Sequence, residues 1–289
     1  YERFSRNEVA SYCKSYVRNG HVWGFVEIGK PDMPSPEEYP YQSFSPTACN
    51  LENYHKENGV GLTMNYIPGK GGLSYPVSTS VILYGDASYF DLEVTVDKPA
   101  DPWPEAGWIC FPFKVNTPAF RVGRNGSIVD PVQDFALPGV NRYMFAVGTG
   151  VAIFDDNKAG VGVCGMNTPL VSLSELGCWK FDNVFVPSRP AVYYNLFNNN
   201  WSTNFRFWNE GKWVYRFRVW AYDHYDAASS LIVPSVEARY PLQYATGTKN
   251  GGKLTKEKRG IELSRKGVLV TAFGADPDGS DGVLLRLWE

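Results

Sequence analysis

Residues 212–220 constrain the fold more than any other part of this sequence, because their side chains alternate in character. Large apolar side chains occupy every second position from Trp213 to Val219, and two arginines fall between them. A period of two residues is the signature of a β-strand with one face against a core. The stretch therefore predicts a long strand, and the aromatic run 193–197 predicts another one shortly before it.

Short runs of the same kind recur along most of the chain, and they are separated by Gly, Pro, Asn and Asp. This spacing is typical of a sandwich or a barrel and not of alternating strands and helices. The sequence therefore predicts an all-β, antiparallel fold. The further strands that it predicts are residues 61–67, 77–83, 89–96, 108–114, 119–122, 143–147, 151–154, 161–164, 260–264, 268–273 and 283–288.

One short helix is predicted at residues 4–18, which begin with a Ser-Arg-Asn-Glu capping box and continue with apolar residues at helical spacing. Five of the 20 prolines then fall within residues 30–46. Such a density of proline excludes regular structure and indicates a linker or a surface loop. We place the domain boundary there, with the helix and linker at 1–46 and the β-domain at 47–289.

Composition bears on the class of partner. The formal charge of −2 leaves no basic excess to neutralise a phosphate backbone, so nucleic acid is not an expected partner. No run of about 18 apolar residues is present, so no membrane span is expected. The chain starts at Tyr1 without a methionine or an apolar leader. Either a signal was removed, as in a secreted or periplasmic protein, or the chain is a piece of a longer one.

Metal sites and cofactor sites are not predicted. The five cysteines have no CxxC spacing, and the three histidines form no HxH or HExxH arrangement. No phosphate-binding loop or dinucleotide fingerprint occurs either. We therefore expect neither a metal nor another cofactor.

The loop 198–204 is rich in amides and lies between aromatic strands. Amides both donate and accept hydrogen bonds, and flat rings offer an apolar face, so together they suit the hydroxyls and C–H faces of a sugar. The alternative is that the rings belong to the core and the asparagines serve tight turns. In the first case the sugar-binding residues are Trp103, Trp108, Asn199, Asn200, Trp201, Asn204 and Trp208.

Glu105 lies between two tryptophans in the sequence, Trp103 and Trp108. Burial against tryptophan can raise the pKa of a carboxyl group until it acts as a general acid, as in glycosidases, which need a second carboxylate. We assign that second role to Asp134, although the spacing of Asp130, Asp155, Asp156 and Asp182 does not exclude them. The alternative is a loop glutamate that pairs with a neighbouring arginine.

Several ordered motifs resemble the C-terminal β region of family 38 glycoside hydrolases, and most closely a bacterial and fungal branch of α-mannosidase-like proteins. The motifs are Pro104–Trp108, Asn141-Arg142, Thr168–Ser172, Asn195–Asn204 and Gly282–Glu289, and the resemblance spans roughly residues 75–289. It implies a large two-sheet supersandwich like that of mutarotase-like proteins and a setting of carbohydrate processing. The family's zinc ligands and nucleophile lie in an N-terminal barrel that no segment here matches, so none of those residues is carried over.

Three functions remain open at this point. The leading one is the β-supersandwich part of a mannosidase-like glycoside hydrolase, which contacts an oligosaccharide or polysaccharide and works with an N-terminal catalytic domain that is missing here. The second is a free-standing glycoside hydrolase with Glu105 as one of two carboxylates. The third is a non-catalytic structural module.

Overall fold

The computed structural model describes residues 1–16, 37, 40–56, 58–68, 75–135, 140–156, 158–200, 206, 208–244, 246, 255, 257–264 and 268–288. The chain divides into two compact units, residues 1–240 and residues 241–289. Within the described part, no helix is both long enough and apolar enough to cross a membrane. The predicted boundary between residues 46 and 47 stays a prediction.

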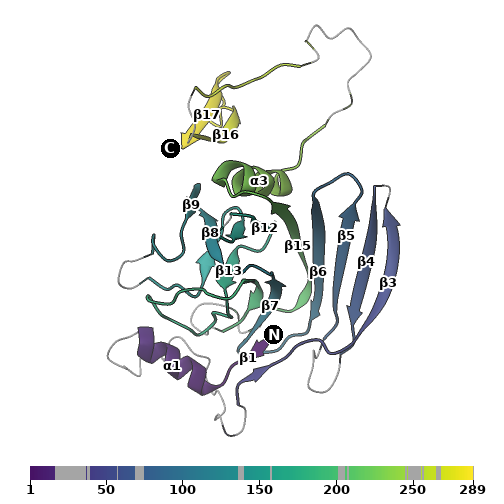
Figure 1. The fold of residues 1–289 in the computed structure, drawn as a ribbon, viewed down its shortest axis with the longest axis vertical. Coiled ribbons are helices and arrows are strands. Elements are labelled where there is room, and N and C mark those ends of the chain that lie inside the picture. Colours follow the sequence, from purple (N-terminus) through teal and green to yellow (C-terminus); the bar gives the residue numbers. More distant parts are fainter. Residues whose placement is uncertain are drawn as a thin grey trace. The chain divides into compact units, whose positions relative to one another are not determined.

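The first unit is a sandwich of two antiparallel sheets (Figure 1). Among the described residues, the larger sheet has nine strands in the order β3 (Cys49–Lys56), β4 (Gly59–Tyr66), β5 (Val77–Tyr84), β6 (Tyr89–Lys98), β15 (Gly211–Tyr222), β12 (Gly160–Gly165), β11 (Val151–Phe154), β8 (Ala119–Arg124) and β9 (Ser127–Val129). The smaller sheet has six, in the order β10 (Phe145–Ala146), β13 (Leu170–Leu173), β14 (Ala191–Asn198), β7 (Glu105–Pro112), β1 (Glu2–Arg3) and β2 (Gln42–Ser43). The predicted all-β, two-sheet supersandwich is confirmed.

Strand β15 shows why the alternating pattern predicted the fold correctly. Tyr215, Phe217 and Val219 are buried between the two sheets, as the period of two residues requires. Trp213 continues this face at the end of the strand, where 44% of it is exposed. The strand pairs with β6 on one side and β12 on the other, so it lies at the centre of the larger sheet.

The main core lies between the sheets and consists of aromatic and β-branched side chains. The smaller sheet contributes Phe111, Val171, Val192 and Tyr194, and the larger sheet contributes Val94, Val122, Ile153, Val163 and Phe217. Burial of apolar surface at about 25 cal/mol per Å² makes this layer the main source of stability. The residues of the candidate site described below lie outside it.

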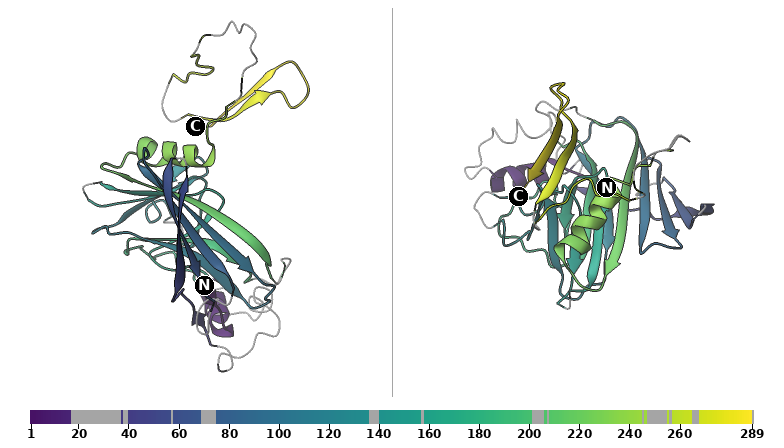
Figure 2. Two further views of the ribbon diagram at one scale, coloured as in Figure 1. Left: turned by 90° about the vertical axis from the view of Figure 1, so that its right-hand side faces the viewer. Right: turned by 90° about the horizontal axis from the view of Figure 1, so that it is seen from above.

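A helix covers the outer face of each sheet (Figure 2). Helix α1 (Arg6–Tyr16) packs Val9 against the smaller sheet, and its predicted cap is present, because the Ser5 N–H donates to the Glu8 carboxylate at 2.7 Å. The π-helical turn η1 (Ala227–Ile232) and helix α3 (Val233–Arg239) cover the larger sheet, with Leu231 against Trp220. The expectation of a single helix is therefore wrong.

The second unit contains a two-stranded hairpin of β16 (Leu269–Ala275) and β17 (Val283–Trp288). Its turn uses Gly279 at φ +81°, a conformation that glycine adopts at little cost. Both strands were predicted. The strand predicted at residues 260–264 is wrong, because these residues form no strand, and β3 and β13 were missed.

Candidate functional site

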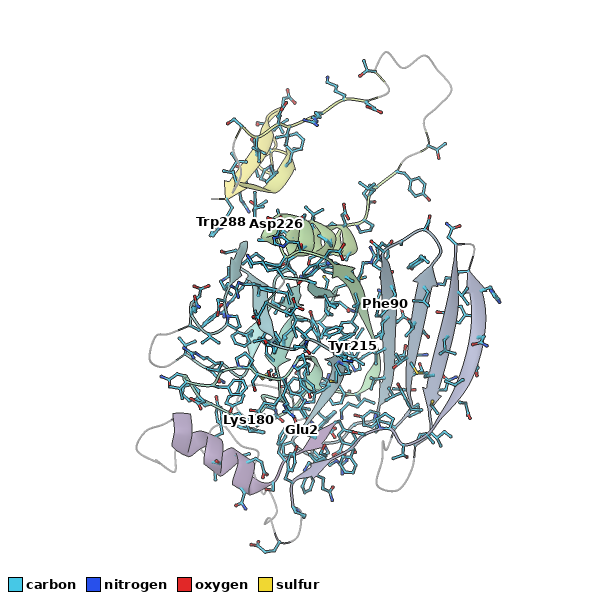
Figure 3. The ribbon with its side chains drawn as sticks, in the orientation of Figure 1. Glu2, Phe90, Lys180, Tyr215, Asp226 and Trp288 are labelled. Carbon is cyan, nitrogen blue, oxygen red and sulfur yellow. The ribbon has the colours of Figure 1, made fainter. Side chains whose placement is uncertain are left out.

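A groove lies on the outer face of the smaller sheet, next to helix α1. It consists of two adjoining hollows of about 600 Å³ and about 720 Å³, and residues 178–180 line both of them. Figure 3 shows Lys180, from the loop 174–189, near Glu2, from strand β1, and both line the larger hollow. The groove thus brings together segments that are far apart in the sequence.

Trp179 is the central residue of the groove. Its backbone has φ +55°, a left-handed conformation that bulky residues rarely adopt. The ring is held edge-on by Phe4, with centroids 6.4 Å apart, and by Tyr12, with centroids 5.4 Å apart. Only 8% of Trp179 is exposed. Backbone strain of this kind persists only where the surroundings enforce it, and it is concentrated at functional sites.

The loop that carries Trp179 is closed at its base by one serine. The Ser174 hydroxyl donates to the carbonyl of Arg189 at 2.8 Å, and the Arg189 N–H donates back to that hydroxyl at 3.0 Å. At the tip, the amide of Asn141 donates to the carbonyl of Lys180 at 2.9 Å. These hydrogen bonds fix the position of the ring between them.

The smaller hollow has a wall of amides. Three asparagines are linked in series by hydrogen bonds. Asn209 Nδ2 donates to the carbonyl of Asn198 at 3.0 Å, and Asn198 Nδ2 donates to Asn195 Oδ1 at 2.7 Å. The side-chain amides of Asn198 and Asn209 have donor and acceptor capacity beyond these bonds. The asparagines that line the hollow are Asn141, Asn198, Asn199, Asn200 and Asn209.

Asn199 and Asn200 are among the predicted sugar-binding residues, and both are 4% exposed. Asn199 accepts from the Glu105 N–H at 3.0 Å and donates to the Asp101 carbonyl at 3.0 Å, so it fastens the loop to β7. Asn200 lies beside Cys178. Burial raises the pKa of that thiol, and the amide of Asn200 opposes the rise.

Two cations line the smaller hollow. Lys180 Nζ is 3.1 Å from the Glu175 carboxylate and 5.3 Å from the centre of the Tyr143 ring. Arg206 contacts Glu210 at 2.8 Å. Each cation therefore has a carboxylate partner at the rim, and the hollow carries little net charge.

Glu2 is a buried carboxylate in the larger hollow. Its two oxygens accept from the Tyr41 hydroxyl at 2.7 Å and from the Trp108 indole at 2.8 Å. Burial raises the pKa of Glu2, and these two donors and the Lys180 charge oppose the rise. A buried carboxylate in contact with tryptophan was predicted from the sequence, but for Glu105. In the structure it is Glu2 that contacts Trp108.

Glu105, the predicted general acid, is fully buried. Its carboxylate forms an ion pair with Lys98, whose side chain is equally buried, and lies 3.6 Å from Arg3 Nε. Burial raises the pKa of Glu105, and the Lys98 ammonium opposes the rise. These contacts are those of a structural ion pair between the sheets. The catalytic role of Glu105 stays a prediction.

The remaining predicted residues are not brought together with Glu105. Asp134 is exposed, and it accepts from the Asp130 N–H at 2.6 Å in a surface turn. Among the contacts of the described residues, none joins the two carboxyl groups. Trp103 is half-buried and donates to the Phe4 carbonyl, Trp208 is 36% exposed and lines neither hollow, and Trp201 and Asn204 lie outside the described residues.

Several groove residues were missed by the sequence reasoning. Trp179 and Lys180 have no alternation or motif around them, and a positive φ cannot be read from a sequence. Asn141 did carry a signal, because it belongs to one of the motifs of the family 38 resemblance. Glu2 lies beside the predicted helix and gave none.

No three His, Cys, Asp or Glu side chains of the described residues are grouped closely enough to hold a metal ion. What the groove offers is an aromatic side chain, amides that both donate and accept, and charges that are paired. Such a surface can hold an uncharged molecule with many hydroxyl groups through paired hydrogen bonds and an apolar contact.

Two solved structures match most of this chain. The crystal structure of an alpha-mannosidase from Enterococcus faecalis V583 covers 83% of it with a TM-score of 0.59 and 11% identity. The structure of a protein in glycosyl hydrolase family 38 from Enterococcus faecalis covers 91% of it with a TM-score of 0.61 and 11% identity. The chain spans only 29% and 32% of their respective lengths.

No protein-family model and no curated protein matches the sequence. The structural likeness nevertheless confirms the resemblance to family 38 structures at the level of the fold. The bacterial and fungal branch stays a prediction.

Proposed function

We propose that this chain is the β-sandwich part of a mannosidase-like, carbohydrate-processing protein and that the groove around Trp179 contacts a glycan. A catalytic portion elsewhere in a longer polypeptide would carry out hydrolysis. The fold supports the first part, because the matched structures include an alpha-mannosidase and are about three times as long as this chain. The chemistry of the groove supports the second.

One observation carries the proposal. A tryptophan in a strained backbone conformation and five asparagines line one hollow of about 600 Å³, which is within the size range of ligand pockets. A core tryptophan needs no strained backbone, and turn asparagines need not face a common space. An aromatic ring and several amides that line the same hollow are the groups by which a protein can recognise a sugar.

Calorimetric titration with mannose-containing oligosaccharides tests the proposal. Trp179→Ala should weaken binding by roughly tenfold or more, as expected for a central aromatic contact. Lys180→Met keeps the length of the side chain and removes a donor at the rim, so it should weaken binding by a similar factor. Trp213→Ala, which removes an exposed tryptophan outside the groove, should leave the affinity unchanged.

The free-standing hydrolase is tested by the same protein. Glu105 is sealed from solvent and paired with Lys98, so we expect no turnover of aryl glycosides or oligosaccharides by the chain alone. Hydrolysis that is lost in Glu105→Gln would establish the enzyme instead. Absence of both binding and turnover would leave the structural module.

A further inference from the structure

Strand β7 has one open edge. It pairs with β14 from Ala106 to Pro112, but on the other side β1 pairs only with Glu105 and Ala106. Main-chain groups of an antiparallel strand point alternately to either side. Because the Phe4 N–H donates to the carbonyl of Pro104, the main-chain groups of Trp108 and Cys110 point to the side of β1 as well. Among the described residues, no strand pairs with them there.

A cavity of about 290 Å³ lies at this open edge, on the line that β1 would follow if it were longer. It is bounded on one side by residues 107–110 of β7 and on the other by residues 43–46, which continue β2. Tyr1 closes one end, where its ring stacks on Phe44 with centroids 4.6 Å apart. We call this cavity the β7 slot.

The floor of the slot is the inner face of the larger sheet, which extends beyond the smaller one (Figure 1). Val94, Thr79, Met64 and Leu51 are directly paired in register across β6, β5, β4 and β3, so their side chains share this face. Val94 is 2% exposed and Thr79 is 3% exposed, but Leu51 at the far end is 62% exposed. Among the described residues, the core face thus continues to an end that nothing covers.

This uncovered face is apolar beyond that one row. Val60 is 54% exposed and Leu83 is 58% exposed, and they lie opposite each other in the same sheet. Contiguous apolar surface of this kind marks an interaction site. An open strand edge beside it supplies the hydrogen-bonding groups by which a further strand can be held.

We propose that the β7 slot receives an extended strand from the catalytic portion that the proposed function implies, and the inference rests on that function. The strand runs antiparallel to β7 and collinear with β1, because the slot is continuous with the existing β1–β7 pairing. It hydrogen-bonds to Trp108 and Cys110. Its alternate side chains are apolar and lie on Val77 and Thr79.

The pairing of β1 fixes the register of the incoming strand. Glu2 lies opposite Ala106. In a strand that extends β1 backwards from Tyr1, the residue directly before Tyr1 therefore lies opposite Trp108, and the residue two positions before that one lies opposite Cys110. Tyr1 points into the sandwich, toward Tyr75 at 5.5 Å, so every second residue counted from Tyr1 faces the apolar floor. The slot therefore selects a pattern of sequence and not just any extended segment.

The experiment is to join a Val-Thr repeat of six residues before Tyr1, so that threonine directly precedes Tyr1 and each valine faces the floor. Amide hydrogen exchange is then measured at each residue by NMR. We expect the amides of Trp108 and Cys110 to exchange roughly tenfold more slowly, or slower still, than in the unextended chain. In a matched extension with proline opposite Trp108 and Cys110, the N–H donors to the carbonyls of these two residues are missing, so the pairing is weakened and the protection should be much smaller.

Equal exchange at Trp108 and Cys110 in all three proteins would overturn the proposal. Concentration-dependent dimerisation of the unextended chain with protection of the same two amides would also overturn it, because the occupant would then be a second copy. Titration of an oligosaccharide into each protein separates the two proposals. Absence of sugar binding in all three proteins would contradict the proposed role of the groove. Amide exchange at Trp108 and Cys110 that is the same in all three proteins would contradict the proposed role of the slot.

Discussion

Lys98 and Glu105 link the two sheets through a buried ion pair, because Lys98 ends β6 of the larger sheet and Glu105 begins β7 of the smaller one. The ammonium also lies 5.3 Å from the Phe197 ring and 5.9 Å from the Tyr75 ring. In this buried environment the two opposite charges compensate each other. If either were removed, the other would be a buried, uncompensated charge.

We expect Lys98→Met to lower the free energy of unfolding by about 3–5 kcal/mol, because Glu105 would lose its main partner. Urea denaturation measures the change. The control is Arg216→Met, which breaks the pair with Glu93 where both side chains are largely exposed and should cost less than about 1 kcal/mol. Equal and small effects of both variants would contradict the structural role of the buried pair.

Glu2 makes the stability depend on pH. Its pKa in the folded state is raised above the ordinary value of 4.5 by burial, so the folded state keeps the proton longer than the unfolded state does. The contribution of Glu2 to stability is therefore full below pH 4.5 and is lost as the pH rises through the pKa of the folded state. Its size is about 1.4 kcal/mol for each unit by which the pKa of the folded state exceeds that of the unfolded state.

Glu2→Gln removes this titration. Urea denaturation between pH 4 and pH 7 should show the wild type losing stability relative to the variant as the pH rises. Parallel stability curves for the two proteins would show that the pKa of Glu2 does not differ between the folded and unfolded states.

The loop 174–189 is the element on which the candidate site depends. Ser174→Ala removes both hydrogen bonds to Arg189, and we expect it to lower the free energy of unfolding by about 1–3 kcal/mol. Limited proteolysis should then cut within the loop, and affinity for an oligosaccharide should fall even though no lining residue has changed. A loop that stays resistant to protease with unchanged affinity would show that Trp179 is held by other contacts.

Strands were predictable from the sequence where alternation and turn residues agreed. Predicted runs 151–154 and 283–288 match β11 and β17 to the residue, because turn residues flank the first on both sides and directly precede the second. Helix α3 was missed because its seven residues include Pro234, two valines and one serine, which have low helix propensity in a helix interior. It continues directly from η1, which is capped by Asp226 and packs Leu231 against the larger sheet.

The candidate site could be predicted only in part. The amide loop was recognised by composition, and Asn199 and Asn200 do line the groove. The strained backbone of Trp179 depends on tertiary contacts with Phe4 and Tyr12 that no local pattern reports. Glu105 had the expected aromatic neighbours in sequence, but strand alternation turned its side chain toward Lys98.

At the scale of the whole molecule, the groove is assembled from the N-terminal helix, the loop 174–189 and the amide loop after β14. Two sheets hold these segments in place, while Leu51, Val60 and Leu83 on the inner face of β3, β4 and β5 are exposed. In our proposals, the groove on one face recognises a glycan and the open edge of β7 docks a further strand. The central claim is that the surface around Trp179 binds a sugar.

Nitrogen-15 labelling of the tryptophan side chains tests that claim most directly. On addition of a mannose-containing oligosaccharide, we expect the indole Nε1 resonance of Trp179 to shift in a saturable manner, because a bound sugar changes the surroundings of its ring. The resonance of Trp213, which lies outside the groove, should stay in place. A Trp179 resonance that does not move at saturating sugar, or that moves no more than that of Trp213, would contradict the account.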